Sequence, residues 1–279
     1  MPRERRFLRW PAVITWLLMV TSPSSSAESV TLDFNSTESP PIWSEFLAKG
    51  GLGGEILQAV AQAANLAVKI RYLPLKRYEQ LVGGSRLGNP LYFVGQEFGA
   101  VIPLLMTQAV FCYYLPHRPQ GIAYQSLADL KGLTLGVIRG TLEDKEAFRR
   151  FGVSVEENTS LEALFRKLRA GRVDVTLAID IMAYDAVERL YPEESGSFRY
   201  VEVPGGITPI AIMLDTSVPD YAQLAARLRQ ALDDVIGSGV YHAILKKYYG
   251  EARIPRDELM QLRRWLIQYD ESPVTVHEY

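Results

Sequence analysis

Residues 126–148 read SLADLKGLTLGVIRGTLEDKEAF, which predicts a short helix, a buried strand and the start of a second helix in immediate succession. Ser126 and Asp129 have the spacing of a capping box, and Gly132 follows as a helix stop. The run Leu133–Ile138 is apolar enough to be a buried strand. A helix, strand and helix in this order are typical of a unit of an α/β sheet.

The turn after this strand is a candidate anion-binding site. Thr141 and Asp144 repeat the capping spacing, so we expect the backbone N–H groups after Gly140 to be free to meet a carboxylate or phosphate. Arg139 stands at the carboxyl end of the strand, where open α/β sheets place ligands, and a guanidinium can bind a carboxylate through two hydrogen bonds. A surface arginine at the end of an ordinary strand explains the same residues.

The N-terminal residues 1–27 have the composition of a secretory signal peptide. Four arginines precede an apolar run, residues 12–20, which is shorter than the roughly 20 residues of a membrane span. Ser25 and Ala27 fit the small-x-small cleavage pattern, so we predict cleavage after Ala27 and a periplasmic mature protein without stable membrane insertion. An uncleaved N-terminal anchor is the alternative.

Charge and cysteine content limit the classes of function. The net charge is −2 with acids and bases mixed throughout, which gives no electrostatic case for nucleic acid or an anionic membrane. Cys112 is the one cysteine, so no internal disulfide can form. His117, His242 and His277 lack metal-ligand spacing. We therefore expect no metal, no cofactor and no enzyme activity, and a small solute as the partner.

Strands alternate with helices along the remaining chain, which predicts an α/β architecture with mixed, largely parallel sheets. Residues 83–99 are rich in glycine and are expected to be loops. Thr159 is predicted to cap a helix, with Glu162 in the capping-box position. The other predicted strands are residues 30–34, 67–73, 98–105, 109–115, 154–157, 173–179, 198–203 and 209–214, and the other predicted helices are residues 52–63, 75–82, 181–190, 218–236 and 257–269.

Several stretches in a fixed order resemble the bacterial extracellular solute-binding proteins of family 3, the periplasmic components of ABC importers for amino acids and similar polar solutes. They are SPPI (39–42), GLGGEIL (51–57), YLPLKR (72–77), GVIRGT (136–141), AGRVDV (170–175) and KKYYG (246–250). The resemblance covers residues 30–250. It implies the type II periplasmic binding protein fold, in which two α/β lobes are joined by a two-strand hinge and the ligand is held between them.

The resemblance also implies a division of the chain and a set of ligand contacts. Residues 28–114 and 209–250 would form lobe 1, residues 115–208 lobe 2, and residues 251–279 a C-terminal helix and tail. In family members that bind amino acids, a lobe 1 arginine binds the ligand carboxylate, but the window 95–105, GQEFGAVIPLL, has none. An aspartate for the ligand amine would fall near Asp180, which is one residue farther from Asp174 than the resemblance implies.

Seven residues are candidates for ligand binding, and each has a structural alternative. Asp180 could instead cap the helix that follows it, an exposed helix start would explain Arg77, and an aromatic residue beside strands is more often part of the core. The full candidate set is Arg139, Gly140, Thr141, Asp180, Trp43, Arg77 and Tyr114.

These observations predict a monomeric protein that binds a small polar, carboxylate-bearing, amino-acid-like solute between its lobes and delivers it to an ABC permease. One alternative is a dehydratase-like cleft enzyme that uses Asp180 and Glu97 as an acid–base pair. The other alternative is a degenerate sensory or protein-binding module. The missing lobe 1 arginine and the glycine-rich residues 83–99 motivate that alternative.

Overall fold

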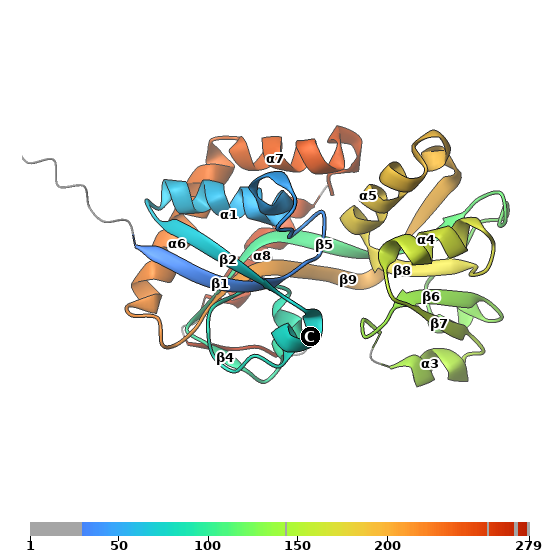
Figure 1. Cartoon of the computed structure of the whole chain (residues 1–279), viewed down its shortest axis with the longest axis horizontal. Coiled ribbons are helices and arrows are strands. Elements are labelled where there is room, and N and C mark those ends of the chain that lie inside the picture. Colours follow the sequence, from blue (N-terminus) through green and yellow to red (C-terminus); the bar gives the residue numbers. More distant parts are fainter. Residues whose placement is uncertain (1–29, 143, 256, 271–272, 278–279) are drawn as a thin grey trace, which may run out of the picture.

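The computed structural model describes residues 30–142, 144–255, 257–270 and 273–277, and the predicted signal peptide lies outside them. The described chain forms a curled eight-stranded mixed sheet with helices around it (Figure 1). The strand order is β2-β1-β3-β9-β5-β8-β6-β7, and β4 pairs separately with β10. The strands are β1 (Thr31–Thr37), β2 (Ala67–Leu73), β3 (Arg86–Gly88), β4 (Glu97–Phe98), β5 (Ala100–Tyr114), β6 (Thr134–Ile138), β7 (Ser154–Asn158), β8 (Val175–Ile179), β9 (Phe198–Leu214) and β10 (Val274–Thr275).

The helices divide between two ends of this sheet, which form two lobes (Figure 1). Helices α1 (Gly51–Ala63), α2 (Leu75–Glu79), α6 (Tyr221–Gly237), α7 (Val240–Tyr249) and α8 (Glu258–Gln268) surround lobe 1. Helices α3 (Lys145–Arg150), α4 (Leu161–Arg169) and α5 (Asp180–Leu190) surround lobe 2. The short 3-10 helices are η1 (Ala48–Gly50), η2 (Pro90–Phe93), η3 (Leu127–Leu130), η4 (Pro192–Ser197) and η5 (Glu251–Arg253). Among the described residues, no helix is long and apolar enough to cross a membrane.

Two long antiparallel strands, β5 and β9, run through both lobes and form the hinge. The sequence predicted two separate strands in each of these segments, and that prediction is wrong. The pairing continues from Ala100 with Leu214 to Tyr114 with Phe198, with register shifts between Pro103 and Leu105 and between Gln108 and Val110. A β-bulge lets a strand bend without ending, so one ladder serves two lobes.

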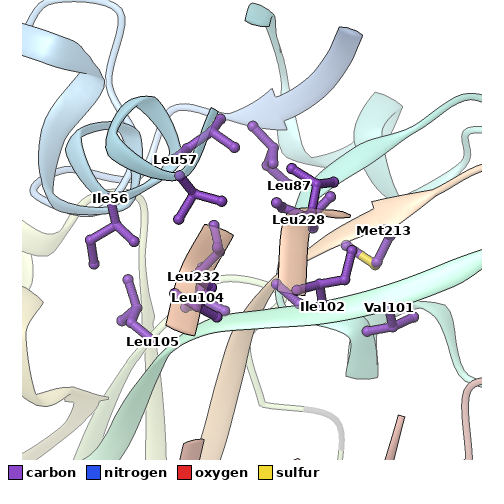
Figure 2. Close-up of a cluster of buried hydrophobic side chains, with 14 of the residues drawn as sticks. Ile56, Leu57, Leu87, Val101, Ile102, Leu104, Leu105, Met213, Leu228 and Leu232 are labelled. Atoms are coloured by element: carbon purple, nitrogen blue, oxygen red, sulfur yellow. The ribbon is translucent and has the colours of Figure 1, made fainter. Parts of the chain in front are cut away.

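Each lobe has its own hydrophobic core. In lobe 1, buried side chains from α1, α6, β3, β5 and β9 pack together, as Figure 2 shows for Ile56, Leu87, Leu104 and Leu232. In lobe 2, one cluster lies under α4 and α5 and a second covers the other face of the sheet around Phe111. Because each core is apolar and closely packed, the lobes can hold the strand ends between them in fixed positions.

Four local predictions meet different outcomes. The capping box of Ser126 and Asp129 is confirmed, since the side chain of Asp129 accepts the Ser126 N–H. Asp144 caps α3 in place of Thr141, because its Oδ1 accepts the Ala147 N–H at 2.8 Å. Likewise Ser160, one residue after the predicted Thr159, caps α4. Within residues 83–99, predicted as loops, the structure has the short elements β3, η2 and β4.

Candidate functional site

The carboxyl ends of the strands in the two lobes face each other. Strand β9 runs from lobe 2 into lobe 1, β3 is antiparallel to it, and β1 and β2 are parallel to β3, so these three strands point toward lobe 2. In lobe 2, β8 is antiparallel to β5, and β6 is parallel to β8, so both point toward lobe 1. Ligands of open α/β sheets bind at the carboxyl ends of strands. These facing ends are therefore the candidate site.

Arg139, Gly140 and Thr141 form an exposed turn at the lobe 2 side of this site. The turn is fixed by the Thr141 hydroxyl, which donates to the carbonyl of Ile138 at 2.9 Å. Gly140 has a φ of 86°, a conformation that favours glycine. The turn thus holds Arg139 at the end of β6, as the sequence predicted for its position.

A carboxylate of the protein itself, Glu157, already lies against this turn. Its Oε1 is 2.8 Å from Nζ of Lys145. The hydrogen bond from Lys145 is the main cause that lowers the pKa of Glu157, with smaller contributions from the Gly140 N–H and the charge of Arg139. Glu157 thus places a negative charge beside the turn that was predicted to meet an external anion. The sequence reasoning missed Glu157, because the neighbouring strand β7 brings it to the turn.

Arg77 lies on the lobe 1 side of the candidate site. It belongs to α2, which begins directly after β2 ends, and its side chain is exposed. The guanidinium forms no ion pair with another described residue. Arg77 and Arg139 thus follow carboxyl ends of strands in different lobes.

Trp43 and Tyr114 have the structural roles that the sequence left open. Trp43 is 2% exposed, and its ring lies 2.8 Å from the place where a Cβ on Gly53 would stand. Tyr114 is at the lobe 2 end of β5, where its hydroxyl donates to Glu194 at 2.6 Å. The structure therefore does not bring these two aromatic rings together with Arg77 and Arg139.

Asp180 is buried at the hinge and bonded to the protein itself. Its side chain is 3% exposed, and Oδ1 accepts the Gln108 N–H at 3.3 Å and the Tyr249 hydroxyl at 3.4 Å. Burial is the main cause that raises the pKa of Asp180 to about 6. Asp180 is the first residue of α5, directly after β8, and its contacts with Gln108 and Tyr249 hold its side chain at the hinge.

Lobe 1 has an arginine close to the window 95–105, but Arg86 points into the core. Its side chain is 1% exposed, and it donates to Oε1 of Gln96 at 2.8 Å and to the carbonyl of Leu81 at 2.6 Å. The guanidinium lies 4.2 Å from the ring centroid of Phe93. Arg86 therefore ties β3 to the segment after it and does not replace the missing ligand arginine.

Solved structures similar to this chain are two-lobed binding proteins. The arginine-, lysine-, histidine-binding protein ArtJ from Geobacillus stearothermophilus has a TM-score of 0.56 and 22% identity, over 85% of this chain and 100% of that chain. The GluR0 ligand-binding core with L-glutamate has a TM-score of 0.59 and 14% identity, over 79% and 99% of the two chains. A histidine kinase sensor domain has a TM-score of 0.57 and 17% identity, over 80% and 96%.

These similarities define the class of the fold. The chain has the two-lobed type II periplasmic binding protein fold, and the prediction of its fold class is confirmed. No family model matches the sequence, and the search of curated proteins finds no match. The resemblance seen in the sequence is thus confirmed at the level of the fold.

Proposed function

We propose that this protein binds a small carboxylate-bearing solute between its two lobes and, as an exported monomer, delivers it to an ABC importer. The observation that carries the proposal is the pair of exposed arginines, Arg77 and Arg139, which follow strand ends that face each other from different lobes. A guanidinium on each side suits a carboxylate held between lobes that close around it. Amino-acid-binding proteins among the solved structures support solute binding.

The residues of the site also favour an anionic ligand that is bound without a contact to an α-amine. The lobe 1 window 95–105 has no arginine, and Asp180 is buried at the hinge. Glu157 lies close enough to Arg139 for the guanidinium charge to lower its pKa, so an incoming carboxylate would share Arg139 with Glu157. Arg139 would therefore serve as the main contact in lobe 2.

The test is thermal unfolding of the mature protein with a panel of organic acids, amino acids, amines and oxyanions. A ligand at about 100 times its dissociation constant should stabilise the protein by roughly 2.7 kcal/mol. For the ligand found, Arg139→Ala and Arg77→Ala should each weaken binding at least tenfold, since each removes a charged contact. Arg166→Ala is the matched control, because Arg166 is exposed on α4 of the same fold.

Two results would decide against this proposal. If no member of the panel shifts the unfolding temperature, and native mass spectrometry of protein purified from periplasm shows no retained solute, solute binding loses its support. If a ligand binds but both arginine variants behave like Arg166→Ala, binding occurs without the proposed contacts.

A sensory module is the second candidate. One similar solved structure is a histidine kinase sensor domain, and the missing lobe 1 arginine fits a departure from amino-acid transport. A ligand that changes association with a membrane kinase, without transport, would favour it. The enzyme alternative gains less support, since Glu97 is exposed on β4 whereas Asp180 is buried at the hinge.

A further inference from the structure

A cavity of about 460 Å³ lies at the hinge, and it differs from the site between the facing strand ends. We call it the hinge cavity. Neither Arg77 nor the turn at Arg139 lines it. Its walls come from the hinge strands, the start of α5 and the C-terminal segment around the start of α8, and they include Met106, Gln108, Asp180, Glu202, Asp257 and Glu258. Cavities of about 300–1,000 Å³ hold small organic ligands.

The described residues that line the hinge cavity carry an excess of negative charge. Four carboxylates come from three parts of the chain: Asp180 from α5, Glu202 from β9, and Asp257 with Glu258 at the start of α8. The lining residues described include one basic side chain, Arg253. It is engaged elsewhere, because it pairs with Glu188 at 2.5 Å and lies 5.2 Å from the ring centroid of Tyr184.

Glu258 has a carboxylate oxygen without a partner. The side chain is 4% exposed, and its Oε1 accepts the Met106 N–H at 3.0 Å and the Tyr241 hydroxyl at 2.7 Å. Its Oε2 is buried and has no hydrogen-bond partner among the described residues. A buried carboxylate oxygen without a hydrogen-bond partner makes the ionised form of the group unfavourable. The cavity wall therefore presents a group whose charge a positive ligand would satisfy.

We propose that the hinge cavity binds a small organic cation, with an ammonium group held by Glu258 and Asp180. Asp180 leaves room for such a contact, since its own hydrogen bonds, from Gln108 and Tyr249, are 3.3 and 3.4 Å long. The side chain of Tyr184 lines the same cavity. Glu202 and Asp257 add to the attraction. This site is independent of the solute site proposed above.

Titration of the lining groups sets the pH dependence of binding. Burial is the main cause that raises the pKa of Glu258 to about 7 and that of Asp180 to about 6. The other groups facing them are the hydroxyls of Tyr241 and Tyr249, the carboxylates of Glu202 and Asp257, and the guanidinium of Arg253. A cation prefers the ionised carboxylates, so its affinity should rise from pH 6 to pH 8, with release of a proton near neutral pH.

The experiment is isothermal titration of the mature full chain with putrescine, and with 1,4-butanediol as a neutral probe of the same chain length. At pH 8 we expect putrescine to bind and the diol not to bind. Glu258→Gln keeps an acceptor for Met106 and Tyr241 but removes the charge, so it should weaken putrescine binding at least tenfold. Asp180→Asn should act in the same direction. Glu193→Gln, an exposed position outside the cavity, is the control and should bind as wild type does.

Several results would overturn the proposal. They are equal binding of putrescine and the diol, no binding of putrescine at pH 8, or equal affinity at pH 6 and pH 8. Unchanged affinity in both Glu258→Gln and Asp180→Asn, with each variant folded by circular dichroism, would place any cation outside the hinge cavity.

Discussion

At the scale of single residues, Glu258 is a carboxyl group whose ionisation opposes folding. Burial raises its pKa from 4.5 to about 7, although the Met106 N–H and the Tyr241 hydroxyl favour the ionised form. The folded protein thus holds a proton between these pH values that the unfolded chain releases. Stability should therefore fall as pH rises from about 4.5 to about 7 and show no further loss from this group above 7, where it is ionised in both states.

Glu258→Gln should remove this pH dependence. The variant should be more stable than wild type by up to about 3 kcal/mol at pH 8 and equal to it at pH 4.5, because one pKa unit corresponds to about 1.4 kcal/mol. Urea unfolding at the two pH values measures the difference, with Glu193→Gln as the exposed control. If Glu258→Gln raised the free energy of unfolding equally at both pH values, the destabilisation caused by Glu258 would come from packing and not from its ionisation.

The sequence predicted where the candidate residues lie along the chain better than it predicted what their side chains contact. Arg139 could be placed because an apolar run and a glycine fix the end of its strand. Glu157 could not, since it reaches the turn only through the pairing of β6 with β7, which no local pattern encodes. Asp180 follows the strand end that the sequence predicted, but its partners Gln108 and Tyr249 come from elements far away in the chain, so its contacts with the hinge could not be predicted.

At the scale of elements, the hinge strands show where local patterns mislead. The polar residues Thr107 and Gln108 interrupt the apolar run, which is why the sequence predicted two strands. In the structure these two side chains bond across the hinge instead of ending the strand. Thr107 lies 3.1 Å from the hydroxyl of Thr208, and Gln108 Nε2 donates to the carbonyl of Val203 at 2.9 Å. Most of the longer helices and strands elsewhere were predicted from periodicity, since those elements bury one regular face, whereas the short β3, η2 and β4 were not.

Gly205 is a position in β9 whose backbone conformation favours glycine. Its φ is 73°, and a Cβ there would meet nothing within 4 Å, so the cost of a side chain is conformational. Gly205→Ala should lower the free energy of unfolding by about 1–2 kcal/mol. Gly196→Ala is the matched control, because Gly196 is equally open and has no positive φ, and it should be neutral or slightly stabilising. If both variants unfold at the same urea concentration, the positive φ of Gly205 carries no conformational cost.

At the scale of the whole molecule, the C-terminal segment is part of the two-lobed fold although the sequence resemblance ends at Gly250. Helix α8 packs against β5 and contributes Leu262 and Trp265 to the core of lobe 1. Before it, Arg253 pairs with Glu188 of lobe 2. The sequence predicted a helix over residues 257–269 from its apolar spacing. It could not predict that this helix covers the hinge, because the surface it packs on is formed by a strand far away in the chain.

If α8 belongs to the core of lobe 1, substitutions to alanine on its buried and exposed faces should change the free energy of unfolding by very different amounts. Leu262 is fully buried, whereas Ile267 on the same helix is 77% exposed. Leu262→Ala should lower the free energy of unfolding by about 2–5 kcal/mol, because it removes buried methyl groups and leaves a cavity. Ile267→Ala should change it by less than about 0.5 kcal/mol. Since a whole domain is stable by only about 5–15 kcal/mol, the first change should be plain in urea unfolding. If both variants changed the free energy of unfolding by similarly small amounts, α8 would not contribute to the stability of lobe 1. The hinge cavity would then lack a fixed wall on the side of α8.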